Sequence, residues 1–354
     1  MSRYLKRNFQ DLEAYVPGEQ PRDMEYIKLN TNESPFPPAP QVVAAMTGEQ
    51  VELLRLYSDP TCKVLKDKLA ALYGVQHENI YVGNGSDELL EFAFMAFSQD
   101  GILFPDITYG FYTVFGDLFQ ADYQQVPLKE DFSVDYRDYC GKNKMVVIAN
   151  PNAPTGLSIP VWQIEEILKS NPNHVVLIDE AYVDFGGESC YSLIHKYDNL
   201  LVVRTFSKSR CLAGGRLGYA IGPAALIGDL EKLKFSTNPY NVNRLSMVLG
   251  EATVDAEDYY QKKCAEIIET REKTAKQLLE MGFEVLPSQT NFLFARSKKI
   301  GGEELYLELK KRGILVRHFN SQRIREFNRI TIGTAEQMEK FIDTVRNIVM
   351  GESL

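Results

Sequence analysis

The sequence predicts an α/β protein with a large domain, in which helices cover both faces of a mostly parallel sheet, and a smaller α+β C-terminal domain. Continuous apolar runs of strand length alternate with amphipathic helical segments, which is the pattern of buried parallel strands. A long, charge-rich helical stretch follows, and beyond it lie short strands and helices. The chain has 354 residues, enough for about two domains. We expect an arm at 1–30, a large domain at 31–250 and a small domain at 251–354.

The expected elements follow the chain in this order. Six prolines before residue 41 predict an extended arm, because each proline fixes a backbone angle and removes a donor. The apolar patterns then predict helices at 62–73, 87–97, 162–169, 303–311 and 335–349. They predict strands at 80–83, 102–104, 145–149, 175–178, 200–204, 283–286, 291–295, 314–316 and 329–332. The stretch between Pro239 and Leu286 is expected to hold the linker helix, with Gly282 at its end.

Composition excludes several classes of function. Lys and Arg number 39 against 48 Asp and Glu, a net charge of −9, which disfavours nucleic acid as a partner. We expect a cytoplasmic protein, because the N-terminus has no apolar signal core. No apolar run approaches the ~20 residues of a membrane span. The five cysteines are scattered without a CxxC pair and no two histidines are four residues apart, so we expect no metal.

The loop after the strand 80–83 reads GNGSDE. Its glycines lead into a helix start, where free backbone N–H groups can hold a phosphate beside Ser86 and Asp87. An ordinary helix N-cap explains the same two residues equally well. Glu88 stands where a dinucleotide-binding fingerprint has its third glycine, which weakens that alternative.

Asp179 directly follows four apolar residues of a predicted strand. A buried carboxylate is costly unless it is paired, so this side chain needs a cationic partner. The protonated ring nitrogen of a pyridine cofactor would serve. A salt bridge to an arginine or a helix cap is the alternative.

The stretch RTFSKSRCLAGGRLGYAIG begins at Arg204, where another predicted strand ends. A lysine such as Lys208 can form a Schiff base with a carbonyl group, and Ser207 with Arg216 can grip a phosphate from two sides. Tyr109, in the loop DITYGFY, can stack on a flat ring. Together these residues suit a cofactor that carries an aldehyde, a flat ring, a basic ring nitrogen and a phosphate. Pyridoxal 5′-phosphate has all four groups.

Seven motifs in order give the chain a resemblance to a known family: LNTNESPFP, YSDP, GNGSDE, NPNAPTG, DEAYVDF, TFSKSRCLAGGRLG and RITIGT. The chain resembles the fold-type I pyridoxal phosphate enzymes, which are aspartate-aminotransferase-like in fold. Within them it is similar to the histidinol-phosphate aminotransferase family of the class II aminotransferases.

The resemblance implies a role for each matching residue. Lys208 would form the Schiff base with the cofactor and move the substrate proton, Asp179 would pair with the ring nitrogen, and Tyr182 would hydrogen-bond the phenolic oxygen. Tyr109 would stack on the ring. The phosphate would be held by Ser86, Asp87, Ser207 and Arg216, together with Tyr57 of the neighbouring subunit. The resemblance therefore implies a homodimer with shared active sites.

The chain departs from the family pattern at Ala153, where an asparagine usually contacts the phenolic oxygen. Asn152 could take over this contact, or the contact is lost. For the substrates, the resemblance indicates Arg329 and Arg317, because a guanidinium binds carboxylates and phosphates with two parallel bonds. Arg317 could equally be a surface strand residue. Asn32 and Glu33, in the arm region, are expected to help close the site.

The leading hypothesis is transamination from L-histidinol phosphate to 2-oxoglutarate, which yields imidazole acetol phosphate and glutamate by a ping-pong mechanism in histidine biosynthesis. An aromatic amino acid aminotransferase and a threonine-phosphate decarboxylase are the alternatives within the family. A nicotinamide-dependent dehydrogenase also fits a parallel sheet, but it leaves Lys208, Asp179 and Arg216 unexplained. A non-catalytic binding protein would not need these residues either.

Overall fold

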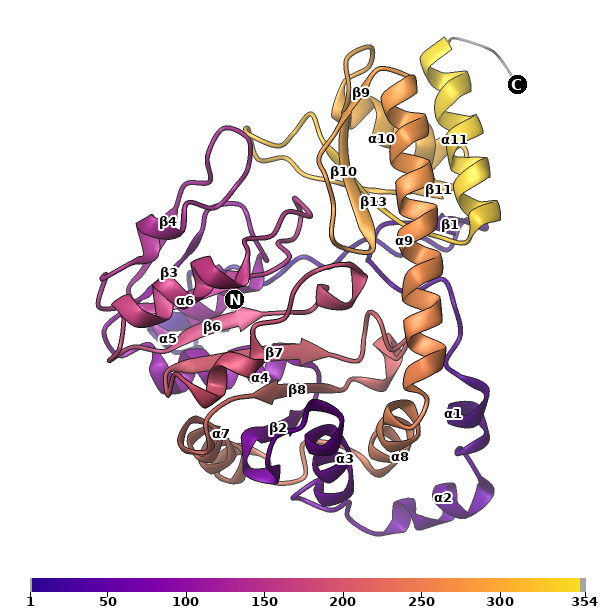
Figure 1. Cartoon of the computed structure of the whole chain (residues 1–354). Coiled ribbons are helices and arrows are strands. Elements are labelled where there is room, and N and C mark those ends of the chain that lie inside the picture. Colours follow the sequence, from indigo (N-terminus) through magenta and orange to yellow (C-terminus); the bar gives the residue numbers. More distant parts are fainter. Residues whose placement is uncertain (1, 351–354) are drawn as a thin grey trace.

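A seven-stranded sheet forms the centre of the computed structural model, which describes residues 2–350 (Figure 1). The strand order is β2-β8-β7-β6-β5-β3-β4. Six of the strands run parallel, and β8 is antiparallel to both of its neighbours. The bounds are β2 Ile80–Gly83, β3 Ile102–Pro105, β4 Tyr123–Val126, β5 Met145–Ala149, β6 Val176–Asp179, β7 Leu200–Thr205 and β8 Gly218–Ile221.

Helices cover both faces of this sheet because successive side chains of its strands point to opposite faces. In β5, Val146 and Ile148 belong to one apolar cluster, whereas Met145 and Val147 belong to the other. The first cluster includes side chains of α3, α6 and α8, and the second includes side chains of α4, α5 and α7. These helices are α3 Lys63–Tyr73, α4 Ser86–Phe97, α5 Phe111–Phe119, α6 Val161–Ser170, α7 Ala224–Thr237 and α8 Arg244–Val254. The predicted α/β architecture is confirmed.

A smaller antiparallel sheet of order β12-β13-β10-β9 follows the long helix α9, Glu257–Glu280, in the chain and lies beside one half of it (Figure 1). Helices α10 and α11 pack with it around a third apolar cluster. The bounds are β9 Phe283–Val285, β10 Phe292–Ser297, α10 Gly302–Lys311, β11 Ile314–Leu315, β12 Arg317–His318, β13 Asn328–Thr331 and α11 Ala335–Met350. This part of the chain has the expected α+β composition.

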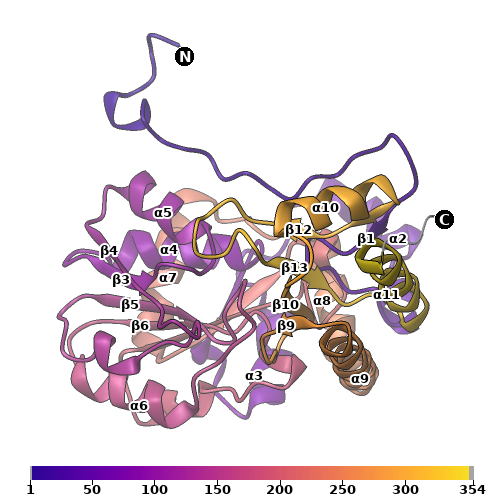
Figure 2. The ribbon, with the colours of Figure 1, turned by 90° about the horizontal axis from the view of Figure 1, so that it is seen from above.

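The N-terminal segment is largely extended, as its prolines predict. It crosses from the small sheet to the side of the large sheet that carries α5 (Figure 2). Its strand β1, Ile27–Lys28, pairs in parallel with β11. The short helices α1 Pro40–Ala44 and α2 Gly48–Glu52 follow, and α1 and α2 contact α8. The 3-10 turns lie at Arg7–Phe9, Leu53–Arg55, His77–Asn79, Tyr136–Tyr139, Val183–Phe185, Tyr191–His195 and Ala213–Gly215.

The structure differs from the sequence expectation in a few elements. The single helical stretch expected at 239–286 is two helices, α8 and α9, which are separated at Asp255 and Ala256. The sequence patterns did not predict the elements β1, α1, α2, α5, α7, β4, β8 and β12. Within residues 2–350, no helix is long and apolar enough to cross a membrane, and no cluster of metal-ligating side chains is found.

Candidate active site

A cavity of about 350 Å³ lies where β5, β6 and β7 end. Because these strands are parallel neighbours, the loops that follow them meet at one edge of the sheet. Ala149, Asp179 and Thr205, the last residues of the three strands, line the cavity. The structure brings most of the predicted cofactor residues together on its walls, namely Ser86, Asp87, Tyr109, Asp179, Tyr182, Ser207, Lys208 and Arg216.

Asp179 is buried at the floor of the cavity. Its carboxylate accepts a hydrogen bond from the Tyr112 hydroxyl at 2.9 Å and another from the Ala181 backbone N–H at 3.1 Å. Across residues 2–350, no cation lies within ion-pair distance of it. Burial raises the pKa of Asp179 to about 6, although the two hydrogen bonds lower it. The carboxylate is therefore poised to accept a cationic partner in the cavity.

Lys208 lies opposite, on the loop after β7, and its Nζ donates to the Thr31 carbonyl at 3.4 Å. The same Nζ lies 5.8 Å from the centre of the Tyr182 ring. The Tyr182 hydroxyl accepts a hydrogen bond from Asn32 Nδ2 at 2.9 Å. An amine and a phenol thus face the same space above Asp179.

The N-terminus of α4 forms one corner of the cavity. Asp87 accepts hydrogen bonds from Arg216 Nη2 at 3.2 Å and from the Tyr109 hydroxyl at 2.8 Å. Gly85 has a φ of +84°, and a Cβ there would lie 2.6 Å from Arg216 Nη2. A Cβ at Gly218 would lie 2.5 Å from the Ser86 nitrogen. Both glycines are required for this close packing of backbone N–H groups and guanidinium, which suits an anion.

A second compartment of about 410 Å³ adjoins the first and shares Thr31, Tyr109, Ala153, Tyr182 and Lys208 with it. The predicted substrate residues Asn32, Arg317 and Arg329 line this compartment. The shared wall places Lys208 between the two spaces. We call this second space the outer compartment.

Arg329 shows what the outer compartment can bind. Its guanidinium lies over the rings of Phe292 and Phe319, 5.3 and 5.7 Å from their centres, and donates to the Asn30 carbonyl at 3.0 Å. Its Nε is buried and has no hydrogen-bond partner among the residues that the structure describes. Burial lowers the pKa of this arginine, although the group remains a cation at neutral pH. The compartment therefore offers an incompletely satisfied cation to an anionic substrate.

Asn152, predicted to replace the missing asparagine contact, lies behind the cavity wall. Its amide donates to the Ile107 carbonyl and to Thr155 Oγ1, each at 3.0 Å, and its oxygen accepts from Thr108 at 2.8 Å. These bonds use the amide for the loop itself, whereas Ala153 lines the cavity. The structure does not support the expectation that Asn152 takes over the contact.

Tyr57 also lies outside the cavity of its own chain. It is 79% exposed, and its ring stacks on Tyr240 with 4.5 Å between centres.

Glu33, expected to help close the site, does line the cavity, and its carboxylate is paired with Lys28 Nζ at 2.6 Å.

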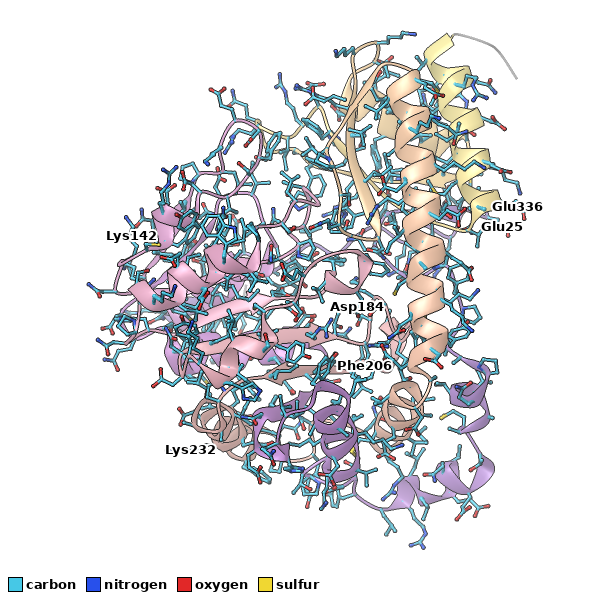
Figure 3. The ribbon with its side chains drawn as sticks, in the orientation of Figure 1. Glu25, Lys142, Asp184, Phe206, Lys232 and Glu336 are labelled. Atoms are coloured by element: carbon cyan, nitrogen blue, oxygen red, sulfur yellow. The ribbon has the colours of Figure 1, made fainter. Side chains whose placement is uncertain are left out.

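Sequence reasoning missed three contacts to the predicted residues. These are the Tyr112 hydroxyl on Asp179, the Thr31 carbonyl beside Lys208, and a bridge formed by Asp184 behind the site. Asp184, labelled in Figure 3, lies between the large sheet and α9. Its carboxylate accepts hydrogen bonds from Ser209 and from Arg204, and so joins the Lys208 loop to the turn after Tyr182. Only Tyr112 had a signal in the sequence, as a second tyrosine three residues after Tyr109.

The residues of the cavity fit pyridoxal 5′-phosphate. A buried carboxylate without a cation suits a protonated ring nitrogen, and the glycine-lined corner at Ser86 and Arg216 suits a phosphate. Among residues 2–350, Lys208 is the only lysine that lines the cavity, where its amine can meet an aldehyde.

Comparison with known proteins agrees with this geometry. The family described as aminotransferase class I and II matches residues 24–345. A histidinol-phosphate aminotransferase of Brachyspira hyodysenteriae is 49% identical over 99% of this chain and 99% of its own. A histidinol-phosphate aminotransferase of Marinomonas sp. is 51% identical over 96% of this chain and 97% of its own.

Solved structures share the fold. The histidinol-phosphate aminotransferase from Sinorhizobium meliloti in complex with pyridoxal-5′-phosphate superimposes with a TM-score of 0.85 and 23% identity, over 93% of this chain and 92% of that one. Cavity, motifs and full-length relatives agree, and the chain belongs to the histidinol-phosphate aminotransferase family of the class I and II aminotransferases.

Proposed function

We propose that this aminotransferase transfers the amino group of L-histidinol phosphate to 2-oxoglutarate, giving imidazole acetol phosphate and L-glutamate. The observation that carries the proposal is the position of Lys208 Nζ between a cavity that fits the cofactor and an outer compartment that holds two arginines. The names of the full-length relatives favour this substrate over an aromatic amino acid.

The chain's own residues bind and orient the reacting groups. When bound, pyridoxal phosphate supplies an aldehyde that captures the amine and a ring that takes up electrons from the substrate carbon. Asp179 would keep the proton on the ring nitrogen, and Tyr182, which accepts a hydrogen bond from Asn32, would donate to the phenolic oxygen. Lys208 Nζ would accept the proton that leaves the substrate carbon. Ser86, Ser207 and Arg216 would hold the phosphate, and Tyr109 would cover the ring.

The outer compartment has to accept two different substrates in turn. L-Histidinol phosphate carries a phosphate, and glutamate carries two carboxylates, so both are anions at neutral pH. Arg317 and Arg329 can bind either anion through parallel hydrogen bonds. Phe319 and Tyr15 add apolar surface for an imidazole ring.

Half-reactions test the substrate assignment directly. Each amine is added separately to the cofactor-loaded enzyme, and the cofactor spectrum is followed in a stopped-flow instrument. We expect L-histidinol phosphate to convert the cofactor to its amine form at least about tenfold more efficiently than phenylalanine, because only the former carries a phosphate for the arginines. A preference for phenylalanine would reject the assignment, and CO₂ release from threonine phosphate would indicate the decarboxylase instead.

We further propose that the enzyme is a homodimer in which Tyr57 reaches the phosphate site of the partner subunit. Tyr57 is exposed and does not line the cavity of its own chain. Exposed apolar side chains lie near it in the chain, at Val43, Met46, Val51, Leu54 and Leu56. An exposed apolar surface of this kind favours an interface.

Mixed dimers test the shared site. We expect Tyr57→Ala to weaken cofactor binding about tenfold, the effect of one lost hydrogen bond to a charged group. A dimer of one Tyr57→Ala chain and one Lys208→Ala chain should regain a native site, because one cavity then has both residues intact. The activity of the mixed sample is compared with that of the two variant homodimers at low cofactor concentration. If it equals only the mean of the two, Tyr57 acts within its own chain.

We also propose the division into an arm at 1–30, a large cofactor-binding domain at 31–250 and a small domain at 251–354. The pairing of β1 with β11 supports the association of the arm with the small domain. A cytoplasmic location stays a prediction.

A further inference from the structure

The arm segment Tyr15–Glu19 bridges the two halves of the molecule across the outer compartment. Its Tyr15 ring stacks on Phe111 of α5, with 4.2 Å between centres and 26° between planes. Its Val16 carbonyl accepts from Arg317 Nη2 at 3.5 Å. Tyr15, Pro17 and Gly18 line the outer compartment, so this segment forms one of its walls. Figure 2 shows the arm crossing between the small sheet and α5.

Glu19 ends this segment and is bound to α10. Its carboxylate accepts hydrogen bonds from Tyr306 and Lys310, and its backbone carbonyl accepts from Asn30 Nδ2 at 2.9 Å. Burial raises the pKa of Glu19, but the bonds from Lys310 and Tyr306 outweigh it and leave the pKa below its usual value. We call Glu19, Tyr306 and Lys310 the arm clasp.

The arm clasp is the main polar attachment of the part of the arm that precedes β1. Among residues 2–24 of the described chain, Glu19 alone makes an ion pair with another part of the molecule. The Arg317 bond to Val16 is long, and the Tyr15 stack contacts only the large-sheet side. Pro17 and Pro21 stiffen the chain on either side of Glu19, so fixing Glu19 also restricts the wall.

We propose that Glu19 is a positioning residue, which the arm clasp fixes on α10 so that Tyr15–Gly18 forms the outer wall of the substrate compartment. The expected change in substrate binding rests on the proposed function, whereas the expected change in how firmly the arm is attached does not. The clasp does not touch Lys208 or the cofactor cavity. Its loss therefore weakens substrate binding and leaves the chemical step unchanged.

Two neighbouring lysines of α10 provide a matched comparison. Lys310 binds Glu19 of the arm, whereas Lys311 binds Glu308 of its own helix at 2.7 Å. Both variants, Lys310→Met and Lys311→Met, remove one positive charge from the same turn. We expect Lys310→Met to raise KM for L-histidinol phosphate about three- to tenfold, with kcat within about twofold, as for loss of a partly exposed charged hydrogen bond. Lys311→Met should leave both constants unchanged.

A charge exchange separates the clasp from a general loss of stability. Glu19→Lys should raise KM as Lys310→Met does, and the double variant Glu19→Lys with Lys310→Glu should restore it toward the wild-type value. Equal KM values for Lys310→Met and Lys311→Met would overturn the proposal. A fall in kcat at unchanged KM would overturn it as well.

Limited trypsin digestion measures how firmly the arm is attached, and it needs no substrate. Cleavage after the arm residues Arg7 and Arg22 should be faster in Lys310→Met than in Lys311→Met, because a released arm reaches the protease more often. If the wild type does not turn over L-histidinol phosphate but this difference persists, the proposed substrate fails and the clasp stands. If the wild type turns it over and the two variants are cleaved alike, the clasp fails and the function stands.

Discussion

Replacing Lys208 by alanine should lower the rate of transamination by about 10⁴-fold or more, while the protein remains folded and still binds pyridoxal phosphate. The substitution removes both the amine that captures the cofactor aldehyde and the group that moves the substrate proton. Proton transfer by a positioned side chain alone contributes roughly 10²- to 10⁴-fold. Steady-state kinetics with a coupled glutamate assay measures the loss, and circular dichroism checks the fold.

Two further lysine variants control this result. Lys208→Arg keeps a cation at the site but cannot give up its proton at neutral pH, so we expect it to be as inactive as the alanine variant. Lys196→Ala removes an exposed lysine that pairs with Glu165, and it should retain full activity. If Lys208→Ala keeps more than about one hundredth of the wild-type rate, the role assigned to Lys208 is wrong.

Asp179→Asn should lower kcat by roughly 10³-fold and at the same time stabilise the cofactor-free protein at pH 7.5. An amide cannot hold a proton on the ring nitrogen, which accounts for the loss of activity. The gain in stability arises because the buried carboxylate has a pKa of about 6 when folded, against a usual value of 3.8. A raised carboxyl pKa means that the folded state binds the extra proton, so stability falls as pH rises between these two values.

The size of this effect follows from the shift. A difference of about two pH units corresponds to about 3 kcal/mol in the free energy of unfolding above pH 6, and Asn avoids this cost. Denaturant unfolding of the cofactor-free wild type and of Asp179→Asn between pH 4 and pH 8 measures this difference in the free energy of unfolding. We expect the difference to shrink toward zero as the pH falls to 4.

Asp184 supplies a control of opposite sign. Its carboxylate is half-buried, and Arg204 and Arg210 hold its pKa below the usual value despite this partial burial. Asp184→Asn leaves these arginines without a full counter-charge and should destabilise the protein at pH 7.5. A cofactor-free Asp179→Asn protein that is less stable than the wild type at this pH would contradict the account of Asp179.

Much of the candidate site could be predicted because the fold places loops by a simple rule. Asp179 ends β6 and Lys208 follows β7, and parallel neighbouring strands bring such residues to one edge of the sheet. The strands themselves are evident because their apolar runs are buried on both faces. Strand β8 was missed because Gly218, needed for close approach to Ser86, merges with the glycine-rich loop before it.

Contacts made only by tertiary packing could not be predicted. Tyr112 reaches Asp179 from α5, and Thr31 reaches Lys208 from the end of the arm region. The sequence leaves open whether Asn152, next to Ala153, replaces the lost contact, because the direction of its side chain is set by packing; in the structure its amide binds the loop itself. Glu19 carries no local signal, because its partners Tyr306 and Lys310 lie almost three hundred residues away.

The most direct measurement concerns the bond between this protein and its cofactor. The purified enzyme is saturated with pyridoxal phosphate, reduced with borohydride, digested with trypsin and sequenced by mass spectrometry, with Lys208→Ala treated in parallel. We expect the reduced cofactor on Lys208 of the wild type and on no peptide of the variant. Stoichiometric labelling of another lysine, or an unmodified Lys208 in a saturated wild-type sample, would contradict it.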